Sequence, residues 1–111
     1  MFDFIRPLNR KVRQIERAIR KCVEPTAAEP VWVTHYGAFD IDPVHLVYWI
    51  CVRSDTERDR LAADEGLMFR LRNLLAEHDY PTAARDRVHI GFESQETVDR
   101  DAGGNWWHHW K

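Results

Sequence analysis

Residues 44–53 read VHLVYWICVR and form the most continuously apolar stretch of the chain. The stretch is rich in β-branched and aromatic side chains, which favours a strand over a helix. Such continuous apolarity is typical of a strand that has neighbours and is covered on at least one face. It falls well short of the ~20 apolar residues that a membrane-spanning helix needs, so no membrane span is predicted. We expect residues 44–53 to form the central strand of a sheet.

Two further segments predict strands on either side of this one. Residues 31–36 (VWVTHY) alternate Trp32, Thr34 and Tyr36 with Val31, Val33 and His35, which favours a strand nearer an edge. Residues 37–43 (GAFDIDP) contain Gly and Asp-Pro, so they suit an antiparallel hairpin connection. Residues 87–93 (RVHIGFE) predict a half-buried third strand.

Apolar residues spaced by three and four predict two main helices. The first helix is expected over residues 7–23, with an otherwise basic surface, and is followed by a linker loop over residues 24–30 (EPTAAEP). The second is expected over residues 56–78, after a capping box that starts at Ser54, with Gly66 as a weak point.

Two shorter segments follow the third strand. Ser94 is expected to cap a short helix over residues 95–102, which Gly103 and Gly104 would end. The aromatic tail, residues 105–111 (NWWHHWK), fits either a terminal strand or a helical turn.

The element order α-β-β-α-β-α predicts an α+β fold. We expect a small mixed three-stranded sheet with the two main helices packed on one face, a half-ferredoxin-like two-layer sandwich. The 111 residues, 44% of them hydrophobic and 31% charged, correspond to one soluble globular domain over residues 1–111. Residues 31–111 would hold the β-β-α-β core and the aromatic tail.

Composition also indicates where the protein works. Cys22 and Cys51 belong to no CxxC motif, so we expect reduced, buried thiols in a cytoplasmic protein. The start of the chain predicts no export signal. Arginine greatly outnumbers lysine, which suggests a GC-rich bacterial genome.

Motifs for nucleotide binding and for common hydrolases are missing from the sequence, and no cofactor is predicted. A weak metal hypothesis rests on Asp40, Asp42 and His45, with His35 at the end of the preceding strand. Aspartate is also common in turns because its side chain bonds the backbone, and that interpretation is preferred here.

The tail offers a second candidate site. Trp106, Trp107 and Trp110 lie beside His108 and His109, and this aromatic segment either folds back to close the core or cover a sheet edge, or forms a hot spot for a partner. Adjacent histidines make a metal site at the tail a minor third hypothesis.

The first helix offers a third candidate. Residues 1–22 carry seven basic and two acidic residues (+5), whereas the remainder carries nine basic and sixteen acidic residues (−7). Arg10, Arg13 and Arg17 suit a phosphate-bearing or acidic partner, although pairing with acidic groups of the same protein explains such charges as well. A fourth group, His89, Glu93 and Asp99, is better explained as surface residues than as an acid–base site.

These patterns favour a non-enzymatic protein-binding module, such as an immunity or accessory factor, that binds a protein partner or a second copy of itself. The first alternative is a nucleic-acid-associated protein that uses the basic helix. The second is a small metal-dependent hydrolase that uses Asp40, Asp42 and His45.

Overall fold

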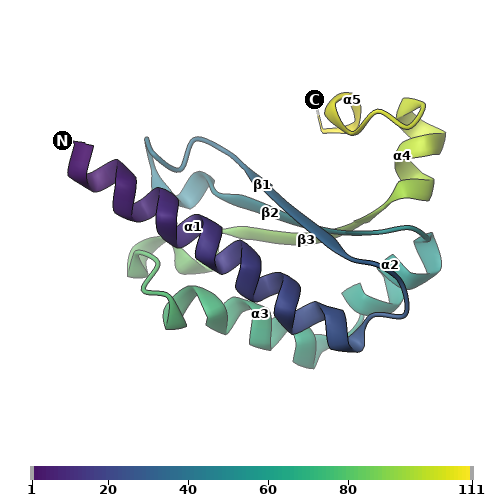
Figure 1. Cartoon of the computed structure of the whole chain (residues 1–111), viewed down its shortest axis with the longest axis horizontal. Helices are drawn as coiled ribbons and strands as arrows, with labels where there is room; N and C mark the ends of the chain where they lie inside the picture. The colour runs from purple at the N-terminus through teal and green to yellow at the C-terminus, as the bar shows by residue number, and fades with distance from the viewer. Residues whose placement is uncertain (1, 111) are drawn as a thin grey trace.

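The structure is a computed structural model that describes residues 2–110, with side chains for residues 8–106, 109 and 110 (Figure 1). Short 3-10 turns occur at Glu24–Thr26, Pro43–His45 and Thr82–Arg87. The helices and strands are α1 (Phe2–Val23), β1 (Trp32–Tyr36), β2 (Val47–Val52), α2 (Asp55–Ala62), α3 (Glu65–Glu77), β3 (His89–Ser94), α4 (Gln95–Ala102) and α5 (Trp106–His109).

The sheet has the strand order β1-β2-β3. β1 pairs antiparallel with β2, and β3 pairs parallel with β2, so that Thr34, Trp49 and Gly91 lie side by side across the sheet. The central position of β2 and the mixed, three-stranded sheet confirm the predicted α+β class.

Some boundaries differ from the prediction. The expected start of the first helix at residue 7 is wrong, because α1 begins at Phe2 and runs through Pro7. Proline lacks an N–H and weakens one turn of a helix without necessarily ending it. The segment expected as one helix over residues 56–78 is divided into α2 and α3, and the division lies at Asp64, whose side chain accepts the N–H of Leu67 (3.0 Å). The tail forms the helical turn α5.

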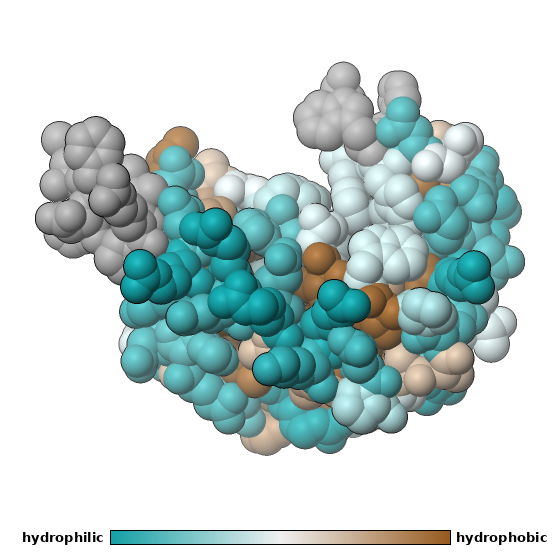
Figure 2. All heavy atoms as spheres, in the orientation of Figure 1, coloured by the Kyte–Doolittle hydropathy of each residue, from teal (hydrophilic) through white to brown (hydrophobic). Residues whose placement is uncertain are grey.

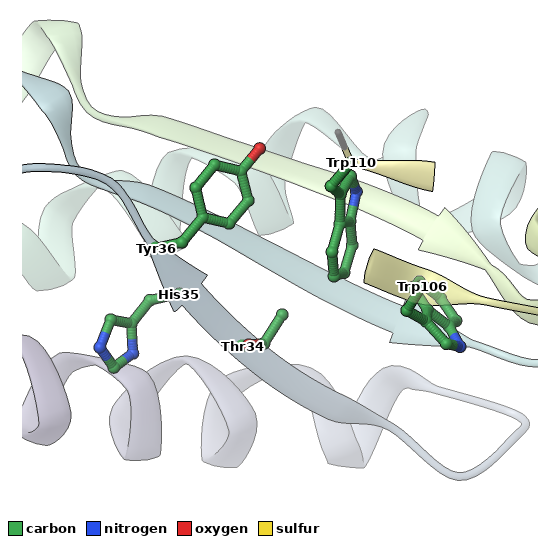
Figure 3. A pocket seen from close by; sticks show the side chains of 5 residues that line it. All are labelled: Thr34, His35, Tyr36, Trp106 and Trp110. Atoms are coloured by element: carbon green, nitrogen blue, oxygen red, sulfur yellow. The ribbon is translucent and has the colours of Figure 1, made fainter. Parts of the chain in front are cut away.

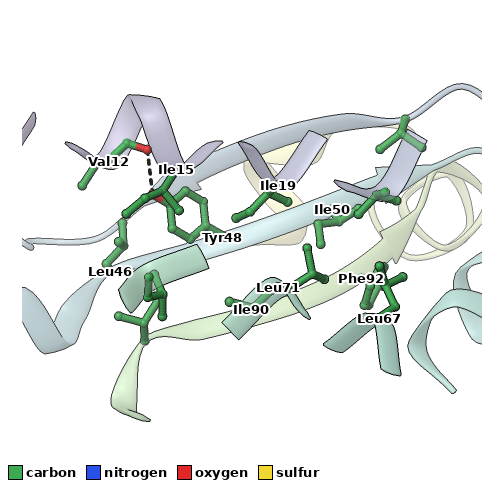
Figure 4. Packing of buried hydrophobic residues seen from close by; sticks show 14 of the residues in the cluster. Val12, Ile15, Ile19, Leu46, Tyr48, Ile50, Leu67, Leu71, Ile90 and Phe92 are labelled. Atoms are coloured by element: carbon green, nitrogen blue, oxygen red, sulfur yellow. Dashed lines mark hydrogen bonds between the residues drawn. The ribbon is translucent and has the colours of Figure 1, made fainter. Parts of the chain in front are cut away.

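α1 and α3 cover one face of the sheet and form the core with it (Figure 4). α1 contributes Val12, Ile15 and Ile19, all fully buried. The hydroxyl of Tyr48 on β2 donates a hydrogen bond to the carbonyl of Val12 (2.7 Å), which satisfies the polar end of a buried ring. The basic helix is therefore an integral part of the core.

The chain between α1 and β1 is fixed by a carboxylate. Glu29 accepts the N–H groups of Arg53 and Ser54, each at 2.9 Å, and also the hydroxyl of Ser54. These contacts hold the predicted linker against the start of α2.

α2 and α4 both begin at the carboxyl ends of neighbouring parallel strands, and a serine caps each of them as predicted. Ser54 accepts the N–H of Glu57 (3.2 Å), and Ser94 accepts the N–H of Thr97 (3.1 Å). α4 ends at Gly103, whose φ of 59° is the left-handed conformation that glycine adopts most easily. Within residues 2–110, the helices are all too short or too polar to cross a bilayer.

Candidate functional site

The sheet face opposite α1 and α3 is partly covered by the tail (Figure 1). Strand alternation places every second side chain on this face, because the intervening residues belong to the core. The side chains on this face are Trp32, Thr34 and Tyr36 from β1, Val47, Trp49 and Cys51 from β2, and His89, Gly91 and Glu93 from β3.

The tail packs on this face through its rings. Trp110 stacks on Trp49 with ring centroids 5.7 Å apart and planes 18° apart, and it also contacts Tyr36 (6.0 Å) and Trp106 (5.0 Å). Trp106 meets Trp32 edge to face at 5.4 Å. These five residues are called the aromatic face below.

A glycine on β3 makes room for this cluster. A Cβ atom at Gly91 would lie 2.7 Å from the Trp49 ring and 2.7 Å from Nε2 of His89. The His89 ring lies 4.9 Å from that of Trp49. The indole of Trp49 therefore fills the space that a side chain at position 91 would need.

Polar contacts fix most of these rings. Trp49 Nε1 donates to the hydroxyl of Tyr36 (3.2 Å), and Trp106 Nε1 donates to Oε1 of Gln95 (2.8 Å). In contrast, Nε1 of Trp110 is buried and finds no acceptor among the described residues, which costs about 1–3 kcal/mol. The indole of Trp110 is therefore held by ring contacts and not by a hydrogen bond from its own N–H.

A pocket of about 370 Å³ opens between β1 and the tail, lined by Thr34, His35, Tyr36, Trp106 and Trp110. In Figure 3 the rings of Tyr36, Trp106 and Trp110 lie on one side of β1, and His35 points to the other side, toward α1. Three consecutive residues of β1 line the pocket, so it reaches around the strand's outer edge. Its size is within the ~300–1,000 Å³ of ligand pockets.

A second hollow of about 280 Å³ adjoins the first. It is lined by Asn9 and Arg13 of α1 together with Phe39 and His35, and His35 belongs to both hollows. Nδ1 of His35 lies 2.7 Å from Oε1 of Glu16, which fixes the imidazole between β1 and α1. The two hollows share His35 at the outer edge of β1 and are together called the β1 groove below.

One basic residue of α1, Arg13, lines this groove, and the wall that contains it is called the basic wall below. Arg10, Arg13 and Arg17 are exposed and form no ion pair with another described residue, whereas Arg20 pairs with Glu24 at 2.9 Å. Figure 2 shows strongly hydrophilic side chains over α1 beside the paler surface over β1 and the tail. The β1 groove thus has one basic wall and one aromatic wall.

Two titratable groups of this sheet face, Glu93 and Cys51, are not free to react. Burial raises the pKa of Glu93, but hydrogen bonds from His109, the Ser94 N–H and Arg58 outweigh it, so the pKa is lowered and the carboxylate is ionised. His109 Nε2 lies 2.7 Å from Oε2 of Glu93. Burial, with a contribution from Glu93, raises the pKa of Cys51 to about 12, so this thiol is not a nucleophile near neutral pH.

The remaining members of the predicted acid–base group and the cysteines have ordinary surroundings. Burial and the charge of Arg72 lower the pKa of His89. Asp99 accepts a hydrogen bond from Gln95 (2.9 Å) on the surface of α4. Both cysteines are free; Cys51 is buried as expected, whereas Cys22 is only partly buried.

The proposed metal ligands do not converge. Asp42 caps the 3-10 turn Pro43–His45 by accepting the N–H of Val44 (3.2 Å). This is the turn-forming role that the sequence analysis preferred for the aspartates over metal binding. His35 pairs with Glu16, and Asp40 and His45 are exposed. Among the residues that the structure describes, no three histidine, cysteine or acidic side chains form a group able to hold a metal ion.

The structure brings only some of the predicted site residues together. Trp106 and Trp110 lie at the pocket, whereas the side chain of Trp107 is outside the described residues. Thr34, Tyr36 and Trp49 were not among the predicted site residues. Alternation of side chains along β1 and β2 was the sequence pattern that could have pointed to these residues. Only folding of the chain brings them next to the tail.

Comparisons with protein-family models, with curated proteins and with solved structures found no match. The half-ferredoxin-like description therefore stays a prediction, and the function must be inferred from the geometry of the aromatic face and the β1 groove.

Proposed function

We propose that this is a non-enzymatic protein-binding module whose contact surface is the aromatic face together with the β1 groove. The observation that carries the proposal is the open pocket between Tyr36, Trp106 and Trp110, which offers tryptophan and tyrosine rings to a ligand. Tryptophan and tyrosine are enriched at the energetic centres of protein interfaces.

Binding accounts for this surface better than catalysis does. The carboxylate of Glu93 is used by His109 and Arg58, and the thiol of Cys51 stays protonated. An acid–base or nucleophilic mechanism needs a group of this kind that is free to react. We place the module in a bacterial cytoplasm, because free cysteines are typical of a reducing compartment.

Nucleic-acid binding is the second candidate, favoured by the unpaired guanidinium groups of Arg10, Arg13 and Arg17. It predicts binding that weakens steeply with salt and is lost when Arg13 and Arg17 are both replaced by Glu.

Photo-crosslinking tests the leading proposal. A benzophenone side chain replaces Thr34 in the pocket or, as a control, the exposed Phe69 on α3, and both proteins are irradiated in cells of the source organism. We expect one protein to be crosslinked from position 34 and not from position 69. That protein is then purified, and its affinity for the wild type and for variants is measured by calorimetry.

Trp110→Ala should weaken this binding by about 30-fold, as expected for a hot-spot tryptophan. Trp110→Phe should retain part of it, and Phe69→Ala should leave it unchanged. Equal affinity of Trp110→Ala and the wild type contradicts the proposal. A crosslinked nucleic acid, released by the double Arg13→Glu, Arg17→Glu variant, favours the second candidate instead.

A further inference from the structure

The outer edge of β1 is a free sheet edge. β1 pairs with β2 alone, and within residues 2–110 no backbone hydrogen bond joins it to another segment. In an antiparallel pair, alternate residues direct their N–H and C=O groups away from the partner strand. Such groups form a template to which another extended chain can add.

The pocket lies where the side chain of an added strand would go. Its lining includes three consecutive residues of β1, Thr34 to Tyr36, and the rings of Trp106 and Trp110. A strand paired with β1 would direct every second side chain toward the aromatic face. One of these side chains, if large and apolar, fits a pocket with mostly aromatic walls.

The basic wall of the groove selects the charge of the partner. Arg13 lines the hollow next to the pocket and forms no ion pair with a described residue, whereas Arg17 lines a separate hollow with His78, on the side of α1 that faces α3. An acidic chain beside β1 would bring carboxylates to the guanidinium group of Arg13, whereas a basic chain would be repelled by it.

The same charges argue against a second copy of this chain at the edge. Two β1 strands paired antiparallel would be related by a two-fold axis normal to the sheet, so both α1 helices would lie on the same side and next to each other. Their basic surfaces would then face each other, and like charges at an interface oppose association.

We propose that the β1 groove binds an extended acidic segment of a partner protein, which adds to β1 as a fourth strand and inserts one large apolar side chain into the pocket. This inference rests on the proposed protein-binding function and specifies its ligand. The backbone of the segment supplies affinity, the apolar side chain fixes its register, and its carboxylates contact the basic wall.

A phage-displayed library of short random peptides supplies the probe. It is selected on the immobilised protein, and binders to Trp110→Ala are counted in parallel. We expect enriched peptides to carry several Asp or Glu residues around one aromatic or large aliphatic residue. The inference is overturned if selection on the wild type enriches no peptides beyond those that bind Trp110→Ala, or if the enriched peptides are basic.

The best peptide is then synthesised with a single N-methyl group at each backbone nitrogen in turn. In a β-pair every second amide bonds to the neighbouring strand, so the affinity measured by fluorescence anisotropy should fall roughly 2- to 10-fold at alternate positions and stay unchanged at those between. This arm leaves the protein unaltered, so folding defects do not affect it. A uniform effect, or none, overturns strand addition.

Charge reversal on α1 tests the basic wall. Arg13→Glu should weaken the acidic peptide roughly 5-fold or more at low salt, and Arg70→Glu, an equal charge change on the exposed surface of α3, should not. An equal loss of peptide affinity in both variants overturns the proposal that Arg13 selects an acidic segment. If the crosslinked partner depends on Trp110 but the N-methyl scan shows no alternation, the proposed function stands and this inference fails.

Discussion

Gly91 shows how a single residue shapes the aromatic face. The residues beside it in the sheet and along β3 carry large rings, and the Trp49 indole lies over the glycine. The sequence alone classed Gly91 as part of a half-buried strand, because alternation does not tell which neighbour fills the space above a glycine. Packing against Trp49 supplies the reason for glycine at this position.

Replacement of Gly91 by Ala should therefore disturb the cluster. The new methyl group would lie 2.7 Å from both the Trp49 ring and the His89 ring, so the rings must shift. We expect a loss of about 1–3 kcal/mol in the free energy of unfolding and a changed near-ultraviolet circular dichroism spectrum.

Gly66→Ala is the matched control for this prediction. A Cβ atom there has no neighbour closer than 3.5 Å, and alanine in a helix is favoured over glycine by about 0.5–1 kcal/mol. Unfolding in urea compares the two variants with the wild type. Equal stability of Gly91→Ala and the wild type would contradict the packing described for Trp49.

Among the elements, α1 has two distinct faces with distinct roles. One face is buried in the core through Val12, Ile15 and Ile19, and the other presents Arg13 to the β1 groove. The helix therefore stabilises the fold and borders the proposed site at the same time. The spacing of its apolar residues was enough to predict the buried face.

Ile19→Ala should lower the free energy of unfolding by about 2–5 kcal/mol, because it leaves a cavity between α1 and the sheet. Arg17→Ala, on the exposed side of the same helix, should change it by less than about 0.5 kcal/mol. Urea denaturation followed by circular dichroism measures both. If Ile19→Ala lowered the free energy of unfolding by less than about 1 kcal/mol, α1 would be peripheral to the core.

Local sequence patterns predicted the helices and strands well, but they did not predict which of these elements contact one another. The serine caps at Ser54 and Ser94 and the stop at Gly103 were read correctly, because capping depends on residues close in sequence. The tail was expected to close the core or cover a sheet edge, but its contact with β1 was not specified, since it joins Tyr36 and Trp110 across most of the chain. The candidate site depends on such distant contacts, so the sequence pattern singled out Trp106, Trp110, Arg13 and His35 but did not predict that they lie around one strand edge.

Over the whole molecule, ionised carboxylates hold together the end where α2 and α4 begin. Hydrogen bonds from Ser94 and Arg100 lower the pKa of Asp55, those from Ser54 lower the pKa of Glu29, and those from Arg60 lower the pKa of Glu57. These groups join segments that are distant in sequence, such as Ser94 and Asp55.

Stability should therefore fall in acid. Each of these carboxyl groups has a lower pKa in the folded state than the ~4 of an unfolded chain, so the unfolded state binds protons first as the pH drops. Their contribution is complete above about pH 5 and is lost progressively below about pH 4. Urea midpoints measured at pH 7 and near pH 3.5 test this expectation.

Asp55→Asn provides the control for the acid effect. It removes one of the titrating groups, so the variant should be less stable at neutral pH and its urea midpoint should change less between the two pH values. An unchanged midpoint of the wild type across this range would contradict the assignment.

The same carboxylates have a consequence for ligand choice. Where strands end and helices begin, free amide groups commonly hold phosphate in proteins. Here Glu29 occupies the amides of Arg53 and Ser54, and Glu96 accepts the N–H of Asp55 at 2.8 Å. These amides at the start of α2 are thus already bonded to the chain's own carboxylates, so a phosphate group on a partner would have to displace Glu29 or Glu96 to bind there.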